Sequence, residues 1–265
     1  MKGSLEPIDR RKALVVLGGM GVAVITAACG SDSTKSSPAS TTAAVPGPSS
    51  SSAAVSCALA PEVTQGPYFL TDHPQASDLV GDRKGAPLAL TLAVVDAACK
   101  PISDAKVDVW HCDGAGEYAG VGGAASASGS GVGAAPAGGG PPGGGGAGGS
   151  AAATRTNTKT WLQGYQATGA DGSVRFDTIY PGWYAGRAVH IHLKVYVGGS
   201  AVHTGQLFFP DDLSTTVFKA SPYRGDPDTL NSGDSIYRSA GSAALLAPVQ
   251  AGNGYTAKAQ LVVKT

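Results

Sequence analysis

Two histidines separated by one residue are the side chains of this chain best suited to chemistry. His190 and His192 lie in the run VHIHLKVY, in which apolar and polar residues alternate strictly. A period of two predicts a β-strand whose side chains point alternately to its two faces, so both imidazoles should project from the same face. Such a pair can hold a metal ion. The pattern by itself fits equally well one histidine in solvent and one satisfied in the core.

Further polar groups converge on the start of this predicted strand. A Pro-Gly turn at residues 181–182 should bring Tyr184 close to the strand, and Arg187 lies between the two. One short segment can therefore present a phenol, a guanidinium group and two imidazoles to a single point. Far upstream, the turn in HCDGAGEYAG presents Tyr118, which by itself is better explained as a packed aromatic residue.

Four motifs that contain these residues resemble, in order and spacing, the intradiol ring-cleavage dioxygenases, the non-haem iron(III) family of catechol and protocatechuate dioxygenases. They are PEVTQGPYF at residues 61–69, VDVWHCDGAGEYAG, the run from WLQGYQ through GRAVHIHLKV, and HTGQLFFPDD. The resemblance spans roughly residues 57–265, apart from a glycine-rich insert after Tyr118. This chain departs from the better-known members by having only five residues between Tyr184 and His190.

The resemblance implies a role for each of six residues. One iron(III) per site would be held by two tyrosines and two histidines, namely Tyr118, Tyr184, His190 and His192. Arg187 and Gln206 would stabilise negative charge that develops on the substrate, a type of interaction worth about 3 to 4 kcal/mol. Tyr184 would also leave the metal and accept a proton from the substrate. The implied reaction is cleavage of a catechol-type ring by O2 between its two hydroxyl-bearing carbons, which produces a muconate-type dicarboxylate.

The chemistry of these side chains agrees with iron(III). A tyrosine phenol has a pKa near 10, so holding it ionised at pH 7 costs about 4 kcal/mol. Two phenolates in one site need a hard, highly charged cation to offset that cost. Iron(III) suits phenolate oxygen and imidazole nitrogen, whereas zinc sites favour cysteine, histidine and carboxylate ligands.

Two functions other than catalysis fit parts of the sequence. A non-catalytic β-sandwich tethered to the cell surface could bind a ligand or a cell-wall polymer, and an extracellular protein could bind iron without turnover. Neither function requires both tyrosines, both histidines, Arg187 and Gln206 together, so the pattern favours the dioxygenase. The formal net charge is zero, which offers no electrostatic footprint for nucleic acid. The expected partners are a small catechol and O2, while the choice of catechol and the oligomeric state stay open.

The remaining histidines have weaker claims to function. His111 lies in a predicted strand and is better explained as a structural residue or as one that supports the metal ligands. His73 and His203 lie in a loop and at a strand edge, where we expect them to be solvated. An alternative role for Arg187 is a surface ion pair with a carboxylate such as Asp177, which would leave it outside the chemistry.

Many short strands separated by glycine and proline turns predict an all-β fold, a β-sandwich of mostly antiparallel short strands with long loops. The expected strands cover residues 88–95, 105–112, 162–167, 173–176, 189–197, 205–209 and 255–263. One helix is expected at residues 211–219, with Asp211 or Asp212 as its N-cap. The glycine-rich insert at about residues 120–153 has no repeat and few bulky side chains, which predicts a surface loop.

The first 56 residues predict targeting rather than folding. Residues 1–29 combine paired arginines with a weak apolar run, which predicts export by the twin-arginine route. Cys29 ends a lipobox-like sequence, and both a lipid anchor and simple cleavage with secretion fit it. Residues 30–56 consist of serine, threonine, alanine and proline with almost no bulky apolar group, and we interpret them as a disordered tether. The folded domain is then expected at residues 57–265.

Cysteine usage agrees with export. An oxidising compartment allows disulfides. If Cys29 carries lipid, the three remaining cysteines can form one disulfide and leave one thiol, and the sequence does not select the pair among Cys57, Cys99 and Cys112.

Overall fold

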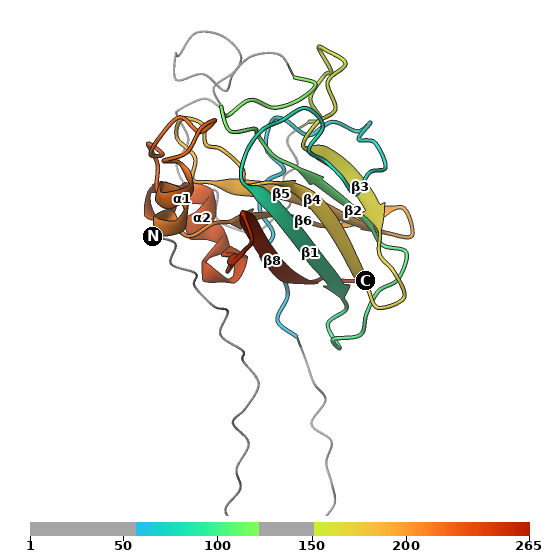
Figure 1. Ribbon diagram of the computed structural model, residues 1–265. Helices are drawn as coiled ribbons and strands as arrows, with labels where there is room; N and C mark the ends of the chain where they lie inside the picture. Colours follow the sequence, from blue (N-terminus) through green and yellow to red (C-terminus); the bar gives the residue numbers. More distant parts are fainter. Residues whose placement is uncertain (1–56, 122–150) are drawn as a thin grey trace, which may run out of the picture. The chain divides into compact units, whose positions relative to one another are not determined.

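Strands with alternating apolar residues pair into two four-stranded sheets in the computed structural model, which describes residues 57–121 and 151–265 (Figure 1). The β1 sheet has the strand order β4-β1-β8-β7, and the β5 sheet has the order β3-β2-β5-β6. The pair β1 and β8 is parallel, and the other paired strands are antiparallel. The expected all-β sandwich is therefore confirmed.

The strand bounds agree with the sequence at most positions. The β1 sheet contains β4 (Ser173–Ile179), β1 (Pro87–Val95), β8 (Gly254–Val262) and β7 (Val249–Ala251). The β5 sheet contains β3 (Gln163–Ala167), β2 (Lys106–Trp110), β5 (His190–Val197) and β6 (Ser200–Phe208). Two strands are longer than expected, since β4 continues to Ile179 and β6 already begins at Ser200. The short, exposed β7 was not expected, because it has no alternating pattern.

The core lies between the sheets and follows the period of two. In β1, every second side chain from Leu88 to Val94 is buried, and in β5 the inward set is Ile191, Leu193 and Val195. Each fully buried leucine, isoleucine or valine contributes about 1.5–3 kcal/mol of hydrophobic stabilisation. The same alternation sends the other side chains of β5 to the opposite face of its sheet, away from the core.

One connecting segment protects an edge of each sheet. The N–H of Ala76 donates to the carbonyl of Tyr165 on β3, and the N–H of Leu79 donates to the carbonyl of Asp177 on β4. Both strands end the hydrogen-bonded order of their sheets. This segment therefore occupies backbone groups that an exposed edge strand would otherwise offer to another chain.

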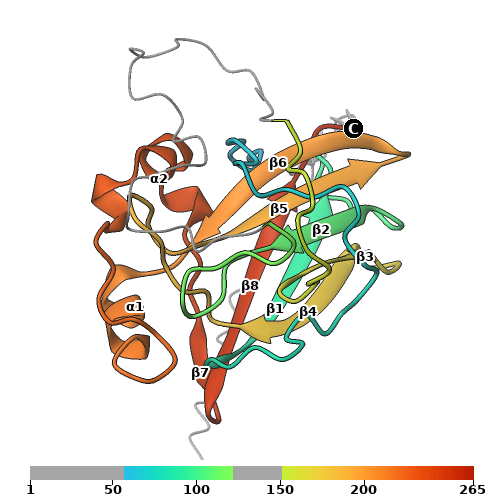
Figure 2. The ribbon, with the colours of Figure 1, turned by 90° about the horizontal axis from the view of Figure 1, so that it is seen from above.

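Two short helices gather at one end of the sandwich (Figure 2). They are α1 (Asp211–Val217) and α2 (Ser235–Ala240), accompanied by the 3₁₀ turns η1 (Asn231–Gly233) and η2 (Ser242–Ala244). The position of α1 is as expected, but its N-cap is Pro210 without a side-chain cap bond, so the expected Asp211 or Asp212 cap is wrong. The helix α2 was not expected, because its six residues are too few to show the repeating pattern of apolar residues that identifies a helix in a sequence. No helix in the described part of the chain is long and apolar enough to cross a membrane.

One disulfide joins Cys57 to Cys99, and the remaining thiol of the described residues, Cys112, is buried. The structure thus selects one of the three pairings that the sequence allowed. The export signal at residues 1–29, the tether at residues 30–56 and all but the ends of the glycine-rich insert lie outside the described residues. These assignments and the lipid anchor on Cys29 stay predictions.

Candidate metal centre

Strand β5 presents its two histidines on the face away from the core, as its alternation predicts. Both are nonetheless buried, with His190 2% and His192 0% exposed, because loops cover this face of the sheet. Their Nε2 atoms lie 3.0 Å apart. The ring of His190 is oriented by a backbone contact, in which its Nδ1 lies 2.6 Å from the carbonyl oxygen of Ala188. That contact makes Nδ1 the protonated nitrogen and leaves a lone pair on Nε2.

Two tyrosines from separate loops complete the group. The phenol oxygen of Tyr184 lies 3.3 Å from Nε2 of His190, and the phenol oxygen of Tyr118 lies 3.2 Å from Nε2 of His192. We call these four residues the tetrad. The structure brings together all four side chains that the sequence nominated as metal ligands, although they come from positions as far apart as 118 and 192.

The loops that carry the two tyrosines touch each other at a glycine. In the first loop, Oδ1 of Asp113 accepts the N–H groups of Ala115 and Glu117, at 2.9 and 3.0 Å, and this turn directs the chain to Tyr118. In the second loop, Gly182 packs on the backbone of Asp113 so closely that a Cβ atom would collide with the carbonyl oxygen. Gly182 is therefore required for the two tyrosine loops to meet.

The donor atoms of the tetrad fit one metal ion. Adjacent ligands around an ion with bonds of about 2.0–2.2 Å stand roughly 3 Å apart, and the neighbouring donor atoms here are separated by 3.0–3.3 Å. The described residues include no cluster of three or more histidine, cysteine, aspartate or glutamate side chains placed to hold a metal. A metal at this position therefore depends on the two phenols.

Burial sets the protonation of the tetrad. It raises the pKa of Tyr118 well above its ordinary value, and it also raises the pKa of Tyr184, an effect that the charge of Arg187 partly opposes. Burial lowers the pKa of both His190 and His192, and Arg187 lowers them further. The imidazoles are thus neutral, as metal ligands must be. The phenols keep their protons unless a cation stabilises the phenolates.

Arg187 lies at the edge of the tetrad and is held on three sides. Its Nη1 is 3.3 Å from the phenol oxygen of Tyr184, and its Nη2 donates to Oε1 of Gln206 at 2.5 Å. Its Nε donates to Oδ2 of Asp234 at 2.9 Å. The alternative in which Arg187 pairs with Asp177 is wrong, because Asp177 lies against Arg175 at 2.7 Å.

A loop from the start of the domain covers the tetrad. The ring of Tyr68 stacks on Tyr118, with centroids 4.3 Å apart, and lies edge-on to Tyr184 at 5.9 Å. The carbonyl of Thr64 accepts Nε2 of Gln206 at 2.8 Å. The sequence did not assign a role to these residues, although both belong to PEVTQGPYF, the first motif of the family resemblance. Asp234 was also missed, and its only sequence signal is the position before the short helix α2.

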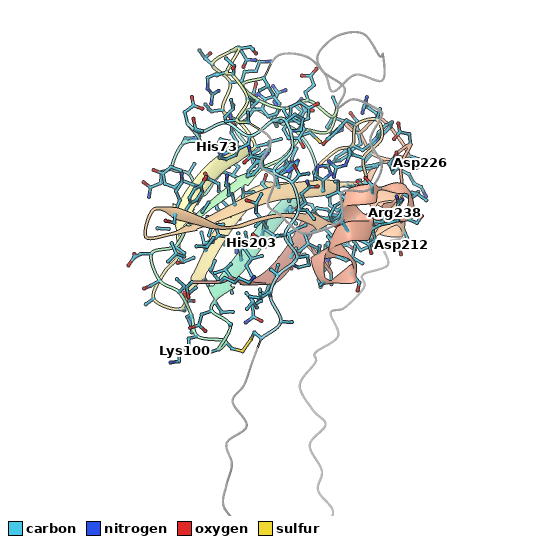
Figure 3. The ribbon with its side chains drawn as sticks, turned by 180° about the vertical axis from the view of Figure 1, so that it is seen from behind. His73, Lys100, His203, Asp212, Asp226 and Arg238 are labelled. Carbon is cyan, nitrogen blue, oxygen red and sulfur yellow. A yellow bond between two sulfur atoms is a disulfide. The ribbon has the colours of Figure 1, made fainter. Side chains whose placement is uncertain are left out.

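Figure 3 labels two of the remaining histidines, His73 and His203, and both are buried rather than solvated. His203 is 4% exposed and His73 is 6% exposed, so the expectation of solvated side chains is wrong for both. The ring of His73 packs against Trp110, and Trp110 in turn stacks on His192 with centroids 5.1 Å apart. His111 is structural, as expected, since its two ring nitrogens contact Thr178 and the carbonyl of Cys112, both at 2.8 Å.

A cavity of about 280 Å³ is lined by Gln206 but by no residue of the tetrad. Its walls come from residues 58–61, β5, β6, the η2 region and β8. Most of the lining residues are apolar. The donor chemistry, rather than the size of a hollow, therefore identifies the site.

The structure is similar to solved structures of intradiol dioxygenases. An intradiol ring-cleavage dioxygenase from Tetranychus urticae is similar with a TM-score of 0.64 and 28% identity, over 78% of this chain and 95% of that one. The dioxygenase domain of a dioxygenase carbohydrate-binding protein fusion from Streptomyces sp. SirexAA-E has a TM-score of 0.54 and 28% identity, over 78% of this chain and 99% of that one. A chlorocatechol 1,2-dioxygenase from Pseudomonas putida shares the fold at 17% identity, with a TM-score of 0.51 and coverage of 77% and 72%. No protein-family model matches the chain, and neither does any curated protein sequence.

Proposed function

We propose that this chain, which is similar in structure to intradiol ring-cleavage dioxygenases, uses iron(III) to open a catechol-type ring with O2. The ring breaks between its two hydroxyl-bearing carbons, and each of these carbons receives one oxygen atom of O2. The muconic acid formed from catechol itself contains every atom of the diol and both atoms of O2, so the reaction balances without a further reductant. The relatives support the class of reaction, while the metal, the substrate and the roles of individual residues are our inference.

The observation that carries the proposal is the buried tetrad with an arginine at its edge. Four donor atoms of two kinds, phenol oxygen and imidazole nitrogen, meet at separations of 3.0–3.3 Å. The tetrad would hold iron(III), which would supply the positive charge that stabilises two phenolates and would activate a bound diol toward O2. A protein that only binds a ligand does not require this combination.

The residues around the metal have separate tasks. Once a bound metal holds Tyr184 as a phenolate, its oxygen would accept a proton from a substrate hydroxyl, and Nη1 of Arg187, 3.3 Å away, would steady the charge at that oxygen. Gln206 bridges Arg187 to the carbonyl of Thr64 and so fixes the guanidinium next to the substrate position. The ring of Tyr68 covers Tyr118 and excludes water from that side of the tetrad.

The proposal is tested with the purified, iron-loaded protein and a panel of catechols. We expect a coloured protein, because phenolates bound to iron(III) give a broad charge-transfer band, together with O2 uptake and formation of a muconate. Tyr184→Phe should perturb the band and slow substrate deprotonation, and His192→Ala should lose the metal. Tyr165→Phe is a matched control, since Tyr165 lies on β3 and contacts Lys106 rather than the tetrad.

The outcomes separate the alternatives. A colourless protein with stoichiometric zinc and no iron would overturn the proposal. Stoichiometric iron with a charge-transfer band but no O2 uptake with any catechol would favour an iron-binding protein instead. If Tyr165→Phe changed the band as much as Tyr184→Phe, the assignment of Tyr184 as a ligand would be wrong.

A further inference from the structure

We propose that Asp234 is a positioning residue of the metal centre, which orients both the guanidinium of Arg187 and the imidazole of His190. The inference rests on the proposed function, and it adds to the site a residue that lies 44 positions after His190 in the sequence. Asp234 does not touch the tetrad. It acts through its hydrogen bonds to the side chain of Arg187 and to the backbone of Ala188, each of which contacts a residue of the tetrad.

The first link is the ion pair with Arg187. Oδ2 of Asp234 accepts Nε of Arg187 at 2.9 Å, and the Asp234 and Arg187 side chains are 1% and 17% exposed, respectively. A planar guanidinium held at Nε can no longer rotate freely. With Nη2 bonded to Gln206, the remaining Nη1 is directed at the phenol oxygen of Tyr184. Asp234 and Gln206 together thus fix the orientation of the guanidinium group that contacts Tyr184.

The second link runs through one residue of backbone to a metal ligand. The same Oδ2 atom also accepts the N–H of Ala188 at 2.9 Å. The carbonyl of Ala188 lies 2.6 Å from Nδ1 of His190. Such contacts behind a ligand fix its tautomer and ring orientation, and their loss typically reduces metal affinity or activity 10- to 100-fold. One carboxylate oxygen therefore supports both Arg187 and His190.

The other carboxylate oxygen anchors Asp234 itself. Oδ1 accepts the N–H groups of Ile236 and Tyr237, at 2.7 and 3.3 Å, and Asp234 is thereby the N-cap of α2. All four of these hydrogen bonds are made by a side chain that is nearly inaccessible to solvent. The helix end and the metal centre consequently share one residue, which gives an otherwise peripheral helix a direct connection to the site.

The charge of Asp234 can be tested separately from its capping role. Asparagine caps helices about as well as aspartate, so Asp234→Asn should leave α2 intact while removing the partner of the guanidinium charge. We expect kcat to fall at least tenfold with a smaller change in KM. The affinity for iron should also fall, because the support of His190 through Ala188 is weakened, while the charge-transfer band persists when iron is in excess. Asp234→Glu restores the charge and should recover part of kcat. Asp211→Asn is the control, because Asp211 also accepts a backbone N–H, from Asn231, but contacts no residue of the site.

A double variant shows whether Asp234 acts through Arg187. In an Arg187→Lys background, Asp234→Asn should reduce kcat by much less than it does in the wild type, because the planar donor that it orients is gone. Full additivity of the two losses in kcat would contradict the link. A purely structural residue would lower the thermal midpoint without changing kcat, and that result would overturn the proposal.

A measurement independent of turnover distinguishes this inference from the proposed function. In the full-length protein loaded with diamagnetic gallium(III), the Nε–H proton of Arg187 should give a resolved NMR signal protected from exchange with water. Asp234→Asn should abolish that protection, while Asp211→Asn should preserve it. If protection persisted in Asp234→Asn, the positioning role would be wrong even in an active enzyme. If it was lost in a protein without dioxygenase activity, the positioning role would stand and the proposed function would fall.

Discussion

Arg187 is a single residue whose partners decide its function. Its three contacts, to Tyr184, Gln206 and Asp234, require a flat group with donors pointing in three directions. Arginine has this shape, whereas lysine carries the same charge on one flexible ammonium group. The charge of the side chain and its geometry can therefore be separated by one conservative substitution.

We predict that Arg187→Lys keeps iron and colour and binds catechol with modest loss, but turns over at least about tenfold more slowly, a rise of 1.4 kcal/mol or more in the barrier. The reason is that lysine cannot contact Tyr184 while also bonded to Gln206 and Asp234. Steady-state kinetics combined with spectroscopic titration of the substrate measure both effects. Full turnover in the variant would show that Arg187 does not take part in the reaction. Loss of iron would show that its role is structural.

His111 gives a second residue-scale prediction, for the dependence of stability on pH. Burial lowers the pKa of His111 from 6.5 to about 4. Between these two values the unfolded chain binds a proton that the folded protein does not, so the free energy of unfolding should decrease as the pH falls from 6.5 to 4. The full effect of this one group is about 3 kcal/mol, present above pH 6.5 and lost at low pH.

The measurement is denaturant unfolding of the wild type and His111→Gln at several pH values. The variant should be less stable near pH 7, because it loses a buried contact to Thr178 or Cys112, and the difference should shrink toward pH 4. Comparing the two proteins cancels the other groups that titrate in this range. Parallel curves would show that His111 does not contribute to the pH dependence.

At the scale of elements, loops rather than strands complete the site. Strand β5 supplies the two histidines of the tetrad by its alternation alone, but both tyrosines, Arg187 and the covering Tyr68 lie on loops. The insert after Tyr118 interrupts one of these loops. Its two ends return to the same place, because the carbonyl of Gly120 accepts the N–H of Thr156 at 2.7 Å.

We predict that removing residues 122–149 and joining the ends with a short loop leaves iron content and the thermal midpoint nearly unchanged. The cost of closing a loop grows only as the logarithm of its length, so a shorter loop should be neutral or slightly stabilising. The hydrogen bond between Gly120 and Thr156 shows that a short connection can span the gap. Metal analysis and thermal unfolding test the deletion, and loss of iron would mean that the insert holds Tyr118 in place.

For the molecule as a whole, the disulfide ties the start of the domain to the turn after β1. It joins Cys57 to Cys99, which are 42 positions apart, and the N–H of Cys57 also donates to the carbonyl of Ala97. A cross-link over this distance stabilises a domain by about 2–4 kcal/mol, chiefly by restricting the unfolded chain. An oxidising compartment, which the predicted export signal would provide, allows this bond to persist.

We predict that Cys57→Ser and Cys99→Ser each lower the free energy of unfolding by about 2–4 kcal/mol and leave the iron content and charge-transfer band unchanged. Both variants remove the same bond, so their effects should agree. Denaturant unfolding and visible absorption measure the two quantities. A large difference between the variants, or loss of iron in either, would show that one of these cysteines contributes more than the disulfide.

The sequence by itself determined those features that depend on local pattern. Alternation along β1 and β5 specified which side chains enter the core, and thereby placed His190 and His192 on one face. The resemblance of its motifs to a known family implied roles for both tyrosines, Arg187 and Gln206, and the structure places all four around the two histidines. Alternation and motifs could be recognised because each is contained in a short run of consecutive residues.

Tertiary structure decided which distant groups meet. The partner of Arg187 is Asp234, 47 positions away, rather than the nearer Asp177. His73 and His203 are buried by segments whose position no local pattern encodes, and the disulfide follows from where the start of the domain and the β1 turn come together. Each of these depends on packing between segments that are separate in the chain, since burial and ion pairing arise from proximity in space rather than in sequence.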